Sequence, residues 1–185
     1  MRNKAQFFST DLIIAVIIFT LLFVTIIWLW EYTQQKITLH EKKAEIEMPA
    51  RIALSSLLQT SGIPSNWSNY SLTDFSSDNI YSIGLSQENN PWNLDSRKIS
   101  KLSSLNITKY LEIKKILGLS NPNFEFYIQF SKWNGSAHNL YSSSGISVWT
   151  NSTFVTSIDR YALIDGEKSH ISMKLWEKCT TPNCN

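Results

Sequence analysis

The chain has 185 residues, enough for one modest domain and an anchoring element. Its 17 basic and 15 acidic side chains give a formal net charge of +2, so we expect no strong electrostatic attraction to nucleic acid. The sequence contains no P-loop, no glycine-rich dinucleotide fingerprint, no GxSxG motif and no HExxH zinc motif. We therefore expect a protein without enzymatic activity, catalytic residues, a metal site or a cofactor.

Residues 12–30 form an apolar run that carries no charged side chain and only two polar ones, Thr20 and Thr25. At about 1.5 Å per residue, a helix over this run is about 28 Å long, close to the thickness of a bilayer's hydrocarbon core. Arg2 and Lys4 precede the run. By the positive-inside rule we expect a cytoplasmic N-terminus, a helix across the cell membrane and an extracellular head.

A cleaved secretory signal does not fit this run. Such a signal has an apolar region of about 7–15 residues, followed by a cleavage site with small residues. Here the run is longer, and the segment WLWEYTQQK at its end contains no Ala, Gly or Ser. The apolar helix is therefore expected to stay on the protein, and an uncleaved signal anchor is one way to achieve this.

The junction ahead of the run reads Lys4-Ala5-Gln6-Phe7, with a cation and a small residue before the apolar segment. This junction resembles the class III signal peptide of archaeal type IV pilin-like proteins. In that family a prepilin peptidase cuts on the cytoplasmic side, after a small residue preceded by Lys or Arg. The resemblance implies cleavage between Ala5 and Gln6, with residues 1–5 as the leader peptide and the apolar helix retained.

Two stretches further along the chain add to the resemblance. LLQTSGIPSNWS and ISKLSSLNITKYLEIKKILGLSNPNFEFYIQF are similar to a recurring pattern of archaeal pilin-like exported proteins. The family implies a long N-terminal helix that carries a small α+β head. It also implies that copies of the chain pack these helices together in a surface filament.

Asp11 stands at the start of the apolar run and has two interpretations. In bacterial pilins a Glu at position five of the mature chain is thought to pair with the N-terminus of a neighbouring subunit. Here Thr10 holds that position and Asp11 follows it, so the resemblance implies that Asp11 neutralises the new ammonium group of Gln6 during assembly. The alternative is a helix N-cap, because Ser9, Thr10 and Asp11 all suit the start of a helix.

Beyond the run, apolar residues recur at helical spacing and form one stripe with a polar back. These residues are Ile46, Ala50, Ala53, Leu54, Leu57 and Leu58. We expect one long helix over residues 6–60, which lays this stripe on a head formed by residues 61–185. Pro49 predicts a kink or a restart, and the helix should end at Ser61-Gly62-Ile63-Pro64.

In the head, residues 65–93 predict an irregular segment with four aromatic anchors. These are Trp67, Phe75, Tyr81 and Trp92. Two short helices should follow, over residues 95–105 and 108–117, and Gly118 should end the second. Its inward residues should be Tyr110, Leu111, Ile113 and Leu117, while Lys114 and Lys115 should be exposed.

Three strands are predicted in the second half of the head. Residues 124–130 alternate, with Phe124, Phe126, Ile128 and Phe130 on one face. Asn134-Gly135 predicts a tight turn, and residues 153–164 and 170–176 read as a hairpin around Asp165-Gly166. The predicted fold class is therefore α+β, with a long helix, two short helices and a small antiparallel sheet.

The polar residues of the head suggest an exported surface. Cys179 and Cys184 have only His170 nearby as a further zinc ligand, so we expect a disulfide in an extracellular compartment. Five N-x-S/T sequons are candidate N-glycosylation sites. They begin at Asn66, Asn69, Asn106, Asn134 and Asn151.

The remaining histidines and tryptophans give weaker signals. His40, His138 and His170 are far apart in sequence, so an exposed structural role is expected for each. Trp133 and Trp149 suggest either a sugar-binding platform or, as the alternative, aromatic residues of the core or of a subunit contact.

These features together predict a structural subunit, major or minor, of an archaeal type IV pilus-like surface filament, processed by a prepilin peptidase. Its expected partners are the membrane, the peptidase, and copies of itself or other pilin-like subunits, which pack through the N-terminal helix. Nucleic acid is not an expected partner. The alternative is a single-pass anchored extracellular binding or adhesion domain that does not assemble.

Overall fold

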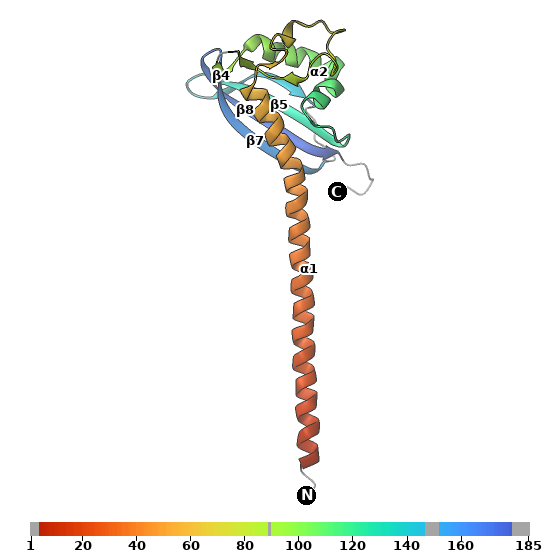
Figure 1. Cartoon of the computed structure of the whole chain (residues 1–185). Coiled ribbons are helices and arrows are strands. Elements are labelled where there is room, and N and C mark those ends of the chain that lie inside the picture. The colour runs from red at the N-terminus through yellow and green to blue at the C-terminus, as the bar shows by residue number, and fades with distance from the viewer. Residues whose placement is uncertain (1–3, 89, 147–151, 179–185) are drawn as a thin grey trace. The chain divides into compact units, whose positions relative to one another are not determined.

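Helix α1 (Lys4–Gln59) is the first element of the computed structural model, which describes residues 4–88, 90–146 and 152–178 (Figure 1). The chain divides into two compact units, residues 1–42 and 43–185, and α1 contributes to both. Within the described residues the fold is α+β, with a long apolar N-terminal helix, a second helix and β-sheets. The predicted fold class is confirmed at this level.

In the second unit, α1 buries the predicted apolar stripe. All six residues of the stripe, from Ile46 to Leu58, are at most 3 % exposed. They belong to one core cluster with residues of the sheet and of the second helix. The compact head therefore includes the C-terminal part of the long helix, because this stripe supplies one wall of its core.

The helix continues through Pro49, so the predicted restart is wrong. Ile46 and Ala50 are buried on either side of the proline, and Arg51 forms an ion pair with Glu47 one turn earlier. These contacts hold both flanks of Pro49 in one helix despite the missing backbone N–H. α1 ends at Gln59, just before Ser61-Gly62-Ile63-Pro64, as predicted.

The segment after α1 contains more regular structure than the sequence predicts. A two-stranded sheet pairs β1 (Gly62–Ile63) with β2 (Ser82–Ile83), and η1 (Trp67–Asn69) is a short 3₁₀ turn. Two further short strands, β3 (Ser86–Gln87) and β4 (Asn90–Leu94), pair with each other. Isolated strands of two residues leave no periodicity in a sequence, which explains why this region reads as irregular.

Two of the four predicted aromatic anchors are buried. Trp67 and Phe75 are fully buried and meet edge to face, with ring centroids 6.3 Å apart. The indole of Trp67 also donates a hydrogen bond to the carbonyl oxygen of Gly84, at 2.8 Å. Tyr81 and Trp92 are instead exposed, so the prediction is wrong for these two.

The main sheet has the strand order β3-β4-β7-β8-β5-β6. Its long strands are β5 (Phe124–Trp133), β6 (His138–Gly145), β7 (Ser152–Ile164) and β8 (Glu167–Lys178). β4 runs parallel to β7 and the other neighbours are antiparallel, so the sheet is mixed rather than purely antiparallel as predicted. Both predicted hairpin turns are confirmed, at Asn134-Gly135 and at Asp165-Gly166.

Helix α2 (Ser96–Ile116) replaces the two predicted short helices. The two are merged across a kink at Lys109, which has non-helical dihedral angles (φ −127°, ψ 21°). Asp95 caps the N-terminus by accepting a hydrogen bond from the backbone N–H of Arg97, at 2.9 Å. Gly118, with φ +76°, follows the last turn as predicted.

The inward face of α2 is only partly the predicted one. Ile113 is buried, but Leu111 is 75 % exposed, so its predicted inward position is wrong. Lys114 is buried rather than exposed, and its ammonium donates a hydrogen bond to the carbonyl oxygen of Pro122 at 3.1 Å. Burial lowers the pKa of Lys114 from its ordinary value. A long side chain of this kind covers the core with its methylene groups, which a polarity pattern does not reveal.

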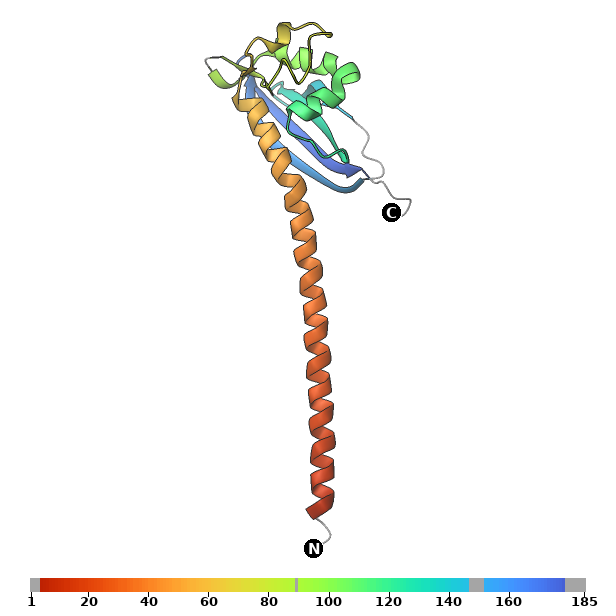
Figure 2. The ribbon, with the colours of Figure 1, turned by 45° about the vertical axis from the view of Figure 1, so that its right-hand side comes forward.

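One face of the main sheet carries the core of the head. The predicted inward residues Phe124, Phe126, Ile128 and Phe130 are all buried, as are Ile171, Met173 and Leu175 on β8. They form a cluster with the stripe of α1 and with Leu102 and Leu105 of α2. Figures 1 and 2 show both helices of the head on this face. The other face bears polar and aromatic side chains at alternate positions.

We predict that Gly145→Ala destabilises the head by at least about 2 kcal/mol. Gly145 has φ +102°, and an added Cβ would overlap the backbone of Phe126 and Tyr127 on β5. Gly135→Ala is the matched control, since Gly135 has φ +95° but open space around it. It should lose only about 1 kcal/mol from the left-handed conformation. Urea unfolding of the full chain in detergent measures both, and equal losses would contradict the packing argument.

Candidate functional site

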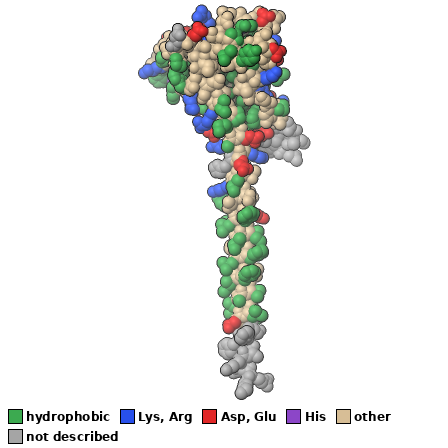
Figure 3. Space-filling view, in the orientation of Figure 1, with side chains coloured by type: hydrophobic (Ala, Val, Ile, Leu, Met, Phe, Trp, Pro, Cys, Tyr) green, Lys and Arg blue, Asp and Glu red, His purple; other side chains and the backbone are tan. Residues whose placement is uncertain are grey.

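The most conspicuous surface of the described chain is the apolar segment of α1. Every residue from Leu12 to Trp30 is exposed, and α1 is long and apolar enough to span a membrane by length and composition. The exposed residues of this segment are apolar around the whole circumference of the helix rather than on one stripe, and Figure 3 shows apolar side chains along the face in view. A helix of this kind is stable only when lipid or other apolar helices surround it.

The threonine hydroxyls of this segment are hydrogen-bonded inside the helix. The hydroxyl of Thr20 donates to the carbonyl oxygen of Val16 at 2.8 Å, and that of Thr25 donates to Leu22 at 2.7 Å. An unpaired hydroxyl in hydrocarbon costs free energy, and these bonds remove that cost. The two threonines therefore add no unpaired hydroxyl to the apolar surface of the segment.

Aromatic rings mark the C-terminal end of the segment. Trp28 and Tyr32 stack with ring centroids 6.0 Å apart. The ammonium of Lys36 lies 4.8 Å from the centroid of the Tyr32 ring. A change from apolar to aromatic to cationic side chains over two turns is typical of a helix that leaves hydrocarbon for the headgroup region.

The predicted processing site lies in the first turn of α1. The helix begins at Lys4, so the backbone of Lys4, Ala5 and Gln6 is helical. Asp11 lies seven residues further on and is exposed. It stands beyond the first turn and does not cap α1, which contradicts the N-cap interpretation. Asp11 forms no ion pair with another residue that the structure describes.

The structure places four of the five sequons. Asn66, Asn69 and Asn134 are exposed, and Asn134 accepts hydrogen bonds at its Oδ1 from Ser136 and Ala137. Asn151, Cys179, Cys184 and Trp149 lie outside the described residues. The disulfide therefore remains a prediction.

Asn106 differs from the other sequons because its side chain is part of the fold. Its amide nitrogen donates to the carbonyl oxygen of Gly145 at 2.9 Å, and its amide oxygen accepts from the N–H of Gly145 at 2.7 Å. Gly145 is the last residue of β6, which lies at the edge of the main sheet. Asn106 thus pairs with this end of the edge strand as a neighbouring strand would.

A polar cleft of about 490 Å³ lies between the N-terminal end of α2 and the loop around η1. Its charged residues are Glu88, Asp95, Arg97, Lys98 and Asp165. Lys98 is 6 % exposed, and its ammonium donates to the carbonyl oxygens of Ser61 at 2.8 Å and Ser86 at 3.1 Å. Burial lowers the pKa of Lys98 from its ordinary value. These bonds tie α2 to the segment after α1, so the role of Lys98 is structural.

His138 and His170 lie side by side, although they are distant in sequence. Their ring centroids are 5.4 Å apart, although β5 lies between β6, which carries His138, and β8, which carries His170. Trp133 and Tyr161 complete a cluster of four rings, in which Tyr161 contacts both histidines; we call it the aromatic cluster. Trp133 pairs with His138 across one hairpin turn, and Tyr161 pairs with His170 across the other. Because both turns can be predicted from the sequence, each of these two pairs could have been found from it.

The described residues contain no group of three or more His, Cys, Asp or Glu side chains arranged to hold a metal ion. No family model matches the chain, and comparisons with curated proteins and with solved structures find no match either. The functional argument therefore depends on the apolar segment, the junction before it and the surfaces of the head.

We predict that Asn106 carries no glycan in protein secreted by its native host, although its sequon is intact. Its amide nitrogen is engaged with Gly145 in the folded head, whereas the amide nitrogen of the exposed Asn134 has no such bond to another described residue. Mass spectrometry of glycopeptides compares the two sites directly. A glycan on Asn106 at an occupancy equal to that on Asn134 would contradict this prediction.

Proposed function

We propose that this chain is a structural subunit, major or minor, of an archaeal type IV pilus-like surface filament. In this proposal a prepilin peptidase removes residues 1–5, and the apolar segment first lies in the membrane and then in the filament core. The observation that carries the proposal is the apolar segment of α1, which is exposed over its full circumference in the single chain.

The energetics of this surface support the proposal. Each large apolar side chain gains about 1.5–3 kcal/mol on leaving water, so covering residues 12–30 is worth on the order of tens of kcal/mol. The hydrophobic core of the head begins at Ile46 and does not include residues 12–30. Both lipid and a bundle of neighbouring apolar helices can cover this surface. The same helix is therefore stable in the membrane before assembly and in the filament core after it.

The junction Lys4-Ala5-Gln6 supports processing, because it carries the residue types of a class III signal peptide directly before the apolar segment. Cleavage would also change the charge. The chain has 17 basic side chains, and the loss of Arg2 and Lys4 leaves 15, equal to the 15 acidic ones. A subunit with no net side-chain charge packs beside its copies with little long-range repulsion.

The position of Asp11 supports a role in assembly over a role in capping. Asp11 is five residues from Gln6, the expected new N-terminus, and lies inside α1. A carboxylate there is costly in an apolar surrounding unless a cation accompanies it. The ammonium group of Gln6 on a neighbouring subunit is the cation that the proposal provides.

A single-pass anchored binding domain is the second candidate. The exposed aromatic cluster favours it, because a filament subunit does not require such a surface. The N-terminal residue of the mature protein separates the candidates. Gln6 at the N-terminus agrees with processing and assembly, whereas a retained Met1 agrees with a plain anchor.

We predict that Ala5→Glu blocks maturation, because the peptidase of this family cuts after a small residue. Ala5→Gly keeps a small residue and is the matched control, which should mature normally. Intact mass of the protein from cells with an archaeal prepilin peptidase distinguishes the chain with residues 1–5 from the one without. Normal removal of the leader from Ala5→Glu would contradict the proposed processing site.

We predict that Asp11→Asn is processed and inserted into the membrane normally but fails in filament assembly. The change is nearly isosteric, and it leaves the ammonium group of Gln6 unpaired in the filament core at a cost of about 3–5 kcal/mol. Glu31→Gln is the control, since Glu31 lies at the other end of the apolar segment and should assemble. Electron microscopy of sheared surface filaments measures the outcome.

Filaments of Asp11→Asn in wild-type amounts would rule out the pairing. Intact mass of the wild-type subunit provides a second check, because cyclisation of an N-terminal Gln removes its positive charge. A fully cyclised Gln6 would also exclude the pairing, without affecting the processing site.

A further inference from the structure

His138 and His170 share the outer face of the main sheet, opposite the core, because the strand register places them there. His138 on β6 pairs with Trp133 of β5, and His170 on β8 pairs with Ser131 of β5. Directly paired residues of an antiparallel sheet lie on the same face, and so do residues two apart on one strand. Ser131 is only 4 % exposed although it faces away from the core, which agrees with two imidazole rings that reach over β5 from its two sides.

The separation of the two imidazole rings suits a shared metal ion. In a tetrahedral site with a bond of about 2.1 Å from each imidazole nitrogen to the ion, the centres of two ligand rings are about 5.3 Å apart. The ring centroids of His138 and His170 are 5.4 Å apart, and the ring planes are inclined by 51°. His138 is exposed, so its ring can turn a nitrogen toward the ion without disturbing the core.

Asp159 on β7 holds His170 in the way that carboxylates hold the ligands of known metal sites. The Nε2 of His170 lies 3.1 Å from a carboxylate oxygen of Asp159. In a neutral imidazole, an N–H at Nε2 that donates to this carboxylate leaves the lone pair of Nδ1 available to a metal ion. Metal-binding histidines usually donate their second N–H to a carboxylate or a carbonyl group. This contact points to a metal ion, because the packing of aromatic rings alone does not require it.

We propose that His138 and His170 bind a divalent transition-metal ion, with Nδ1 of His170 as one ligand and Asp159 as the residue that positions it. Imidazole nitrogens favour Zn²⁺, Cu²⁺ and Ni²⁺, whereas Ca²⁺ and Mg²⁺ prefer oxygen ligands. Two protein ligands leave the other coordination positions to water. The site is therefore open and weaker than a structural zinc site, which has four protein ligands.

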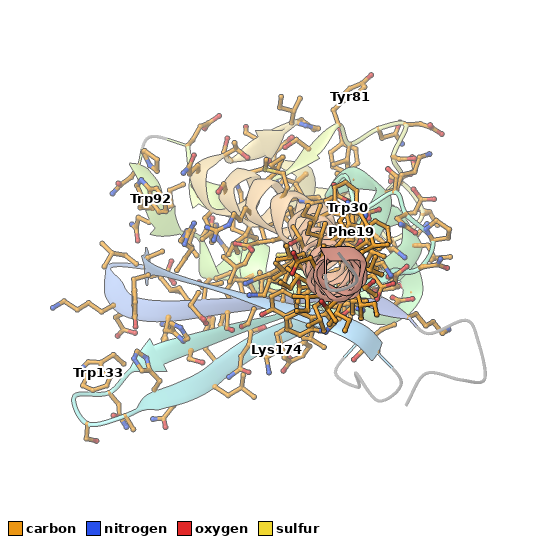
Figure 4. The ribbon with its side chains drawn as sticks, turned by 90° about the horizontal axis from the view of Figure 1, so that it is seen from below. Phe19, Trp30, Tyr81, Trp92, Trp133 and Lys174 are labelled. Carbon is orange, nitrogen blue, oxygen red and sulfur yellow. The ribbon has the colours of Figure 1, made fainter. Side chains whose placement is uncertain are left out.

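The sheet holds both histidines in place before a metal ion binds. β5 is hydrogen-bonded to β6 on one side and to β8 on the other. The ring of Trp133 lies 4.9 Å from that of His138 between centroids, and the ring of Tyr161 lies 5.2 Å from that of His170. Ligands that are ordered in advance lose less conformational entropy on binding. Figure 4 shows Trp133 at the end of β5, where the strand turns into β6.

The inference goes beyond the proposed filament and does not depend on it, because every residue of the site belongs to the head. It applies equally to an anchored domain that does not assemble. Failure to bind a metal ion would therefore leave the filament proposal untouched, and failure to form filaments would leave the metal site untouched.

The test uses the full chain in detergent micelles, without a histidine tag and with the substitutions Cys179→Ser and Cys184→Ser, so that neither a tag nor a thiol binds the metal. Isothermal titration calorimetry measures the binding of Zn²⁺ and Cu²⁺, with Mg²⁺ as the comparison. We expect one ion per chain with a Kd below about 100 µM, tighter for Cu²⁺ than for Zn²⁺, and no binding of Mg²⁺. Electron paramagnetic resonance of the Cu²⁺ complex should show two nitrogen ligands.

Matched variants assign the ion to its ligands. His138→Ala and His170→Ala should each weaken binding of Zn²⁺ at least about tenfold and leave one nitrogen ligand in the Cu²⁺ spectrum. His40→Ala removes the third histidine of the chain and should bind as the parent does. Asp159→Ala should weaken binding about tenfold, whereas Ser157→Ala, two residues earlier on β7, should not. Thermal unfolding without metal should be nearly the same for all five variants, which separates loss of the site from loss of the fold.

Three results would overturn the proposal. The first is the absence of binding of both Zn²⁺ and Cu²⁺ at about 1 mM, a concentration at which even weak sites are occupied. The second is unchanged binding in His138→Ala or in His170→Ala, which would assign the ion to another group. The third is half an ion per chain together with metal-dependent dimers, which would mean that the histidines of two copies share the ion. Unchanged affinity in Asp159→Ala would contradict its positioning role.

Discussion

The apolar surface of α1 between residues 12 and 30 must be shielded from water. The function of the chain depends on what shields it. The segment is apolar on all sides, and moving its side chains out of water is favourable by on the order of tens of kcal/mol. The segment is therefore not stable while it is exposed to water. The core of the head uses a different part of the helix, from Ile46 onward. The surrounding must therefore come from lipid or from other chains.

The head incorporates the C-terminal part of α1, from Ile46 onward, into a folded core. The stripe of α1 fills one wall of its core, and the sheet and α2 fill the others. Contacts such as Lys98 to Ser61 and Ser86, and Asn106 to Gly145, tie the pieces together through backbone carbonyl and amide groups. The outer face of the sheet is not needed for this purpose, which leaves it available for binding.

The sequence predicted those parts of the fold in which apolar residues repeat at the spacing of a helix or a strand. The stripe from Ile46 to Leu58 and the alternation of residues 124–130 were visible because burial of one face repeats every 3.6 or 2 residues. The parallel pairing of β4 with β7 and the meeting of His138 with His170 were not, because each joins residues far apart in the chain. For the candidate site, the apolar segment could be read directly, whereas the capping interpretation of Asp11 failed because α1 begins earlier, at Lys4.

The central claim is that the apolar segment of α1 leaves lipid and packs against the same segment of other subunits. A photo-reactive benzoylphenylalanine at Phe19, which is 69 % exposed in the single chain, tests this most directly. After irradiation of the native host, sheared surface material should contain adducts in which residue 19 is joined to the α1 segment of another copy. If residue 19 forms adducts only with lipid, and the protein stays wholly in the membrane fraction, the account of this chain as a filament subunit is wrong.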